Sequence, residues 1–131
     1  MRFETQLDTV VLAVLIAGLM PLICTVIAKW GAQDYDNHNP RVWMAKLDGV
    51  QGRANAAQQN CLEAFPFFAV GVILAALGGA DGDMLEMLSW VFIAVRGVYI
   101  FCYIMDKAMW RSISWVVGYG IVIYLYVLSL Y

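Results

Sequence analysis

Long apolar runs without charge set the strongest limit on how this chain folds. Thr9 to Ala28 and Ser112 to Tyr131 each hold about 20 uncharged residues, the length at which an α-helix crosses a bilayer. Two further runs, 64–80 and 87–105, have the same character, although Arg96 interrupts the second. Only 14% of the 131 residues are charged and 63% are hydrophobic, a composition unlike that of soluble domains. The pattern predicts four transmembrane helices.

Turn-forming residues between these runs indicate where the helices end. Asn, Asp and Pro gather in the stretch 33–40, and Gly and Asp in the stretch 78–83. We expect helices over about 5–29, 42–77, 84–103 and 110–130, in a single domain that covers residues 1–131. The first helix is longer than a signal-peptide core, so we expect it to be retained. The predicted fold is an all-α integral membrane four-helix bundle with antiparallel up-down topology.

The distribution of charge predicts how the bundle lies in the membrane. Lys and Arg surround the first and third connections, whereas the second has three acidic residues, Asp81, Asp83 and Glu86, and no basic ones. The positive-inside rule therefore places the first and third loops in the cytoplasm and both termini outside. The three acidic residues lack the other ligand positions of a calcium loop, so we expect no metal site. The net charge of −2 says little about partners, because its distribution is more informative than its sum, and we expect no nucleic-acid partner.

The cysteines and the single histidine offer little obvious chemistry. Cys24, Cys61 and Cys102 each lie inside a predicted helix, and their odd number implies no disulfide framework. Small apolar packing residues are the favoured interpretation, with Cys61 also facing a polar stripe. His38 lies in the first loop, so a histidine base has little support.

Polar residues within two of the predicted helices form matching stripes. Asn60 and Glu63 share one helix face, and Arg96, Tyr99 and Tyr103 follow the spacing i, i+3, i+7 on the next membrane-spanning helix. Residues equally far from the connecting turn lie at similar depth, which places Arg96 about one helical turn from the level of Glu63. We therefore expect an ion pair between them. The cluster either stabilises the helix bundle through a salt bridge and hydrogen bonds, or it forms a ligand pocket. Residue spacing alone does not distinguish these two possibilities.

The run Asn60-x-x-Glu63-x-x-Pro66, preceded by Arg53 and followed by Arg96-x-x-Tyr99-x-x-x-Tyr103, resembles the MAPEG superfamily, the membrane-associated proteins in eicosanoid and glutathione metabolism. The resemblance extends to length, helix count and the long first loop, and is of the bacterial type. It implies a homotrimer in the bacterial inner membrane, with glutathione as a co-substrate between neighbouring subunits near the cytoplasmic side. The glutathione-binding residues that it implies are Arg53, Gln58, Asn60, Glu63, Arg96, Tyr99 and Tyr103.

The same resemblance implies a catalytic role for Arg111, which would stabilise the glutathione thiolate, the reactive form of the thiol. The implied activity is a transferase or peroxidase that acts on lipophilic electrophiles. One departure stands out: Ala56 occupies a place where glutathione-binding enzymes of this type carry an Arg.

The alternative function is a non-catalytic MAPEG-fold trimer that binds lipid or quinone, or a structural subunit of a larger membrane complex. Ala56 favours it, as does an aromatic exterior. These aromatic residues also suit anchors at the membrane interfaces; they are Trp90, Trp110, Trp115, Tyr119, Tyr124, Tyr126 and Tyr131.

Overall fold

The computed structural model describes the backbone of residues 2–131 and the side chains from residue 4 onward. This part of the chain forms five helices: α1 (Arg2–Ala28), α2 (Pro40–Ala45), α3 (Gly49–Leu77), α4 (Gly82–Ile104) and α5 (Ala108–Leu128). Residues Glu4–Ala28 of α1 and the whole of α3, α4 and α5 are long and apolar enough to cross a membrane. The predicted all-α bundle of four membrane-length helices is confirmed.

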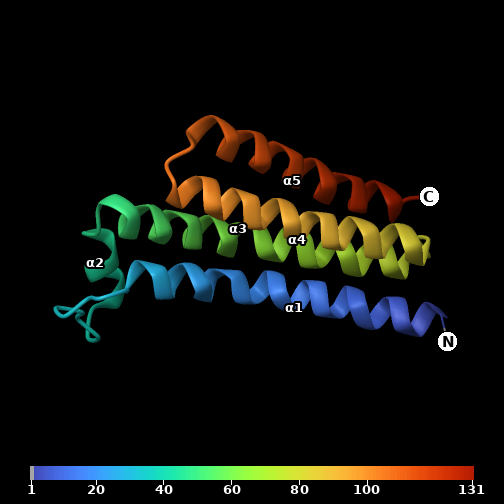
Figure 1. Cartoon of the computed structure of the whole chain (residues 1–131). Helices are drawn as coiled ribbons and strands as arrows, with labels where there is room; N and C mark the ends of the chain where they lie inside the picture. Colours follow the sequence, from blue (N-terminus) through green and yellow to red (C-terminus); the bar gives the residue numbers. More distant parts are fainter. Residues whose placement is uncertain (1) are drawn as a thin grey trace.

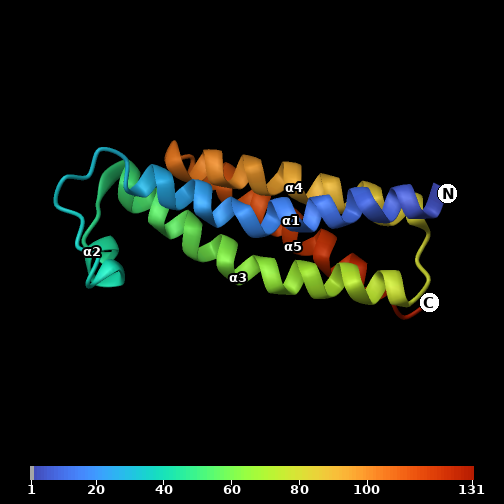
Figure 2. The same ribbon diagram turned by 90° about the horizontal axis from the view of Figure 1, so that it is seen from below.

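The four long helices lie side by side, and both ends of the chain lie at the same end of the bundle (Figures 1 and 2). The turn between α3 and α4 lies at this end, which we call the terminal end. The short α2 and the loop before it lie at the opposite end, which we call the α2 end, as does the link between α4 and α5 (Figure 1). The halves of the bundle that adjoin these ends are called the terminal half and the α2-side half.

The single helix expected over 42–77 is wrong, because the chain breaks between α2 and α3. Asp48 is extended, with φ −128° and ψ −179°, and Gly49 has a positive φ of 57° that other residues rarely adopt. Gly52 keeps the break compact, since a Cβ there would lie 2.7 Å from the Leu47 carbonyl oxygen. The Asn55 side chain then ties the two helices by donating to the Met44 carbonyl at 3.3 Å.

Polar residues of the acidic turn hold the terminal end together. Asp81 caps α4, because its carboxylate accepts from the backbone N–H of Met84 at 3.1 Å. Thr9 of α1 donates to the Glu86 carboxylate of α4 at 2.7 Å, and the Gln6 side chain of α1 donates to Asp83. These acidic residues thus link α1 to α4 and cap the first turn of α4.

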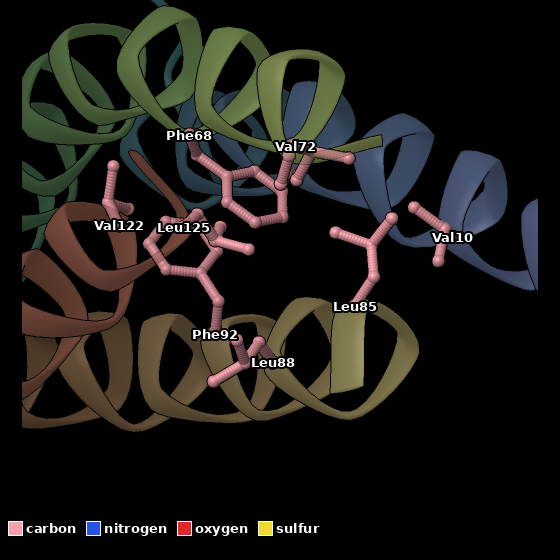
Figure 3. Packing of buried hydrophobic residues seen from close by; sticks show 10 residues of the cluster. Val10, Phe68, Val72, Leu85, Leu88, Phe92, Val122 and Leu125 are labelled. Atoms are coloured by element: carbon pink, nitrogen blue, oxygen red, sulfur yellow. The ribbon is translucent and has the colours of Figure 1, made fainter. Parts of the chain in front are cut away.

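The terminal half has an apolar core to which all four long helices contribute (Figure 3). At its centre the rings of Phe68 and Phe92 stack with centroids 4.0 Å apart and planes 13° from parallel. The other members are Val10, Ala17, Val72, Ala75, Leu85, Leu88, Val122 and Leu125. Inside a membrane the lipid tails are as apolar as the side chains, so the hydrophobic effect does not drive helices together. Close packing of this kind holds them together instead.

Small residues bring α1 and α3 close together in the α2-side half. Cys24 and Ala28 of α1 are fully buried, as are Ala54 and Ala57 of α3. Side chains of this size let two helix backbones approach closely in a membrane. The interface therefore places side chains of α1 directly beside the polar stripe of α3.

Candidate functional site

Arg96 of α4 is the centre of the polar cluster, and it is almost fully buried, with 4% of its surface exposed. Its guanidinium donates to the Asn60 side-chain oxygen at 2.9 Å and to the Cys61 sulfur at 3.1 Å, both on α3. The same group lies over the ring of Tyr99, 4.2 Å from the centroid. The forked guanidinium thus joins α3 to α4 through two separate hydrogen bonds.

The expected ion pair between Glu63 and Arg96 is absent from the described structure, so that prediction is wrong. Glu63 lies on an exposed face of α3, whereas Arg96 points into the bundle toward Asn60 and Cys61. Three helical residues span about 300°, so Asn60 and Glu63 point about 60° apart even though they share a side of the helix. That rotation allows Asn60 to reach Arg96 while Glu63 points past it.

Glu63 and Arg96 nevertheless line the same cavity, which has a volume of about 210 Å³ and lies between α3, α4 and α5. Its polar wall is formed by Asn60, Glu63 and Arg96. Its apolar wall consists of Ala64, Phe67, Phe92, Trp115, Gly118, Tyr119 and Val122. The cavity therefore combines one positive group, one negative group and an aromatic surface.

Tyr99, Tyr103 and Arg111 continue the cluster toward the α2 end. The rings of Tyr99 and Tyr103 meet edge to face with centroids 5.7 Å apart. The Arg111 guanidinium, from the first turn of α5, lies over the Tyr103 ring at 4.5 Å. The structure thus brings the predicted catalytic Arg111 into one continuous chain of contacts with Arg96, through two tyrosine rings.

Two of the predicted ligand residues lie elsewhere. Arg53 donates from Nε to the Ile104 carbonyl at 3.0 Å, so it fastens the start of α3 to the end of α4. Gln58 lines a different cavity of about 400 Å³, between α1, α2 and α3, which also contains Lys29 and Arg41. Both residues lie outside the lining of the cavity that holds Glu63.

Sequence patterns did not single out the aromatic wall of the main cavity. Trp115 and Tyr119 were expected on an aromatic exterior that suits lipid or quinone binding or membrane anchoring. They are exposed, and they also stack with centroids 4.8 Å apart and line the cavity. A usable signal was present, because Trp115, Gly118, Tyr119 and Val122 follow the spacing i, i+3, i+4, i+7 of one helix face. Gly118 is buried, as expected where α5 approaches α4.

Comparison with protein families matches residues 9–131 to the MAPEG family. The chain belongs to the MAPEG family. Neither a curated protein nor a solved structure matches it. The match begins within α1 and continues to the last residue, so it includes every residue of the polar cluster. Together with its four membrane-length helices, membership makes this MAPEG chain a multi-pass membrane protein.

Proposed function

We propose that this MAPEG-family chain is a glutathione-dependent transferase or peroxidase that acts on lipophilic electrophiles. One observation supports the proposal: Arg96 and Glu63 line one cavity, and neither forms an ion pair with another described residue. Glutathione carries an ammonium group, two carboxylates and a thiol, so a carboxylate of the ligand suits Arg96 and its ammonium suits Glu63. Each charge-assisted hydrogen bond of this kind contributes about 1.5–3 kcal/mol.

A neighbouring copy of the chain would complete this site. Glu63 is exposed midway along a membrane-length helix, where a carboxylate that faces lipid is strongly unfavourable. The cavity of about 210 Å³ is also smaller than most ligand pockets, which measure about 300–1,000 Å³. Gln58, Lys29 and Arg41 line the other side of α3, so a second copy could present them to a ligand held by Glu63. These features support a homotrimer with glutathione between subunits.

Arg111 is the proposed activating residue. Its guanidinium lies at the end of the chain of contacts that begins at Arg96, and its contact with the Tyr103 ring fixes its position. A nearby guanidinium stabilises a thiolate, so the thiol proton passes to water and the sulfur becomes the nucleophile. In transfer, a carbon–sulfur bond forms as the electrophile takes up the electron pair. The aromatic wall of Phe67, Trp115 and Tyr119 offers that electrophile an apolar surface.

The alternative is a non-catalytic trimer that holds a lipid or a quinone. The aromatic wall favours it, because seven of the ten residues that line the cavity present apolar or aromatic groups. Ala56 also favours it, since it leaves glutathione with one cationic contact fewer than the family resemblance implies. A quinone that binds in the cavity while glutathione does not would establish this alternative.

Calorimetry with glutathione on the detergent-purified protein tests the proposal. We expect binding at or below millimolar glutathione, with loss of affinity in Glu63→Gln and loss of conjugation activity in Arg111→Ala. The matched control is Glu86→Gln, because Glu86 lies near the terminal end, bonded to Thr9 and outside the cavity. No binding to the wild-type protein at millimolar glutathione would rule out the proposal.

We further propose that the α2 end faces the cytoplasm of a bacterial inner membrane. The basic residues near this end, Lys29, Arg41, Lys46, Lys107 and Arg111, support that orientation. Cysteine replacements at Asp36 and Asp81 test it with a membrane-impermeant thiol reagent, since the three native cysteines are buried. Labelling of Asp36→Cys in intact cells would show the opposite orientation.

A further inference from the structure

Among the residues that the structure describes, the buried guanidinium of Arg96 has no carboxylate partner, so Cys61 is the hydrogen-bonded neighbour that can carry a balancing negative charge. The hydrogen-bond acceptors of Arg96 are the neutral Asn60 amide and the sulfur of Cys61, 3.1 Å from Nη2. An unbalanced charge inside a membrane bundle is unfavourable, so the contact favours the negatively charged form of Cys61. A thiolate beside an arginine is the reactive form of cysteine.

A second cysteine from α1 contacts the first. Cys24 is fully buried and Cys61 is 3% exposed, and both belong to one cluster with Met20 and Ala57. The two thiols therefore lie close together between α1 and α3. With negative charge held on Cys61 by Arg96, Cys24 is the neighbouring neutral thiol. The Cys61 sulfur thus lies between a guanidinium on α4 and a thiol on α1.

Cys61 also borders a small hollow that adjoins the main cavity. The hollow measures about 10 Å³, and its lining includes Cys61 together with Ala64, Phe92 and Arg96, which also line the main cavity. This volume holds about one water molecule. Such a site suits a peroxide group and excludes bulky reagents.

We propose that Cys61 and Cys24 form a redox-active dithiol that reduces hydroperoxides at the bilayer interior. The Cys61 thiolate attacks the peroxide, so a sulfur–oxygen bond forms, the oxygen–oxygen bond breaks, and the leaving alkoxide takes a proton to become an alcohol. The Cys24 thiol then attacks the sulfenic acid of Cys61, which forms the disulfide and releases water. Two thiols supply the two electrons. Two molecules of a low-molecular-weight thiol restore the dithiol and become a disulfide themselves.

Cys102 provides an internal comparison, because it is a buried free cysteine of α4, and the hydrogen bonds of Arg96 within the described structure go to Asn60 and Cys61 instead. The detergent-purified protein is reduced, freed of thiols and treated with hydrogen peroxide, and its peptides are mapped by mass spectrometry. We expect a Cys24–Cys61 disulfide that dithiothreitol reverses. Oxidation of Cys61 should be at least about tenfold faster than that of Cys102, since reactivity follows thiolate character.

Three variants separate the roles of the residues. Cys24→Ser should accumulate the sulfinic acid of Cys61 in excess peroxide, detected by mass spectrometry, because no second thiol removes the sulfenic acid. Cys61→Ser should yield neither the sulfinic acid nor the disulfide, and Arg96→Gln should slow the oxidation of Cys61 by hydrogen peroxide toward the rate of Cys102. Equal oxidation of Cys61 and Cys102 in the wild-type protein would overturn the proposal, whether or not any variant folds.

This inference stands apart from glutathione binding, since the oxidation is measured without glutathione. Cys24→Ser should also bind glutathione as the wild-type protein does, because Cys24 lies outside the lining of the main cavity. Failure of glutathione binding with oxidation intact would refute only the transferase proposal. The reverse result would refute only the dithiol.

Discussion

The two halves of the bundle are built differently, although the same four helices form both. In the terminal half, apolar side chains such as Phe68, Val72 and Leu125 fill the interior around one stacked pair of rings. In the α2-side half, the interior holds Arg96, three buried thiols and the edge of a cavity. Apolar packing stabilises the fold, whereas a buried charge contributes little net stability because its removal from water is costly. The difference indicates that the terminal half contributes most of the stability of the fold, whereas the α2-side half contains the candidate functional groups.

The largest effect should come from the core of the terminal half. Phe68→Ala removes a fully buried ring that stacks on Phe92, so we expect a loss of about 3–5 kcal/mol in the free energy of unfolding. Reversible denaturation in mixed micelles measures this loss. Phe101→Ala is the matched control, because its ring is 62% exposed. Equal losses in the two variants would show that the terminal half lacks the dominant role assigned to it.

In contrast to the core substitution, removal of the buried charge should affect ligand binding more than stability. Arg96→Met eliminates the cation that lines the cavity, so glutathione affinity should fall by about 1.5–3 kcal/mol, the value of a charge-assisted bond. The unliganded protein should lose little stability, since an apolar chain of similar length fills the space of the buried cation. Calorimetry and denaturation on the same preparation measure both. A large loss of stability would mean that the α2-side half also depends on Arg96 for its fold.

A third comparison uses two glycines. A Cβ on Gly78, at the end of α3, would lie 2.8 Å from the Ser129 carbonyl oxygen, whereas a Cβ on Gly97 of α4 would meet no atom within 4 Å. Gly78→Ala should therefore lower stability by about 1–3 kcal/mol through overpacking against the end of the chain. Gly97→Ala should leave stability unchanged or raise it, because Ala favours the helix. Thermal denaturation distinguishes them, and a neutral Gly78→Ala would show that the terminal end is loosely packed.

Sequence patterns predicted the number of helices and the depth of their polar residues well, because both follow from the length of each apolar run and the distance of a residue from its turn. Charge-free runs gave the four helices, and depth placed the Asn60 stripe beside Arg96. The direction in which each side chain points from its helix axis was harder to predict from the sequence. Glu63 turns away from Arg96 by a fraction of a helical turn, and Arg53 meets a backbone carbonyl that no periodicity reveals. The contact between Cys24 and Cys61 depends on how α1 aligns with α3, which only the packed bundle determines.

The break before α3 illustrates a different limit of prediction from sequence, which concerns where a helix begins. Residues 42–77 read as one helix because most of them favour helix, yet Gly49 and Gly52 allow the chain to turn where Asp48 is extended. A glycine within a helical pattern is compatible with both outcomes. The packing of α2 against α3 through Asn55 and Met44 decides between them.

The smallest effect is expected in the loop before α2, outside the membrane-spanning helices. The Asn39 side-chain amide, followed by the His38 backbone N–H, holds the pKa of the Asp36 carboxyl below its ordinary value. A lowered pKa means that the stabilisation is fully present above the ordinary value and is lost as pH falls through the lowered one. The loop should therefore loosen only in acid, while the terminal half keeps its packing. Amide hydrogen exchange at His38 and Asn39 measures this, with Asp36→Asn as the control that removes the titrating group. Identical acid dependence in both proteins would assign the loosening to another group.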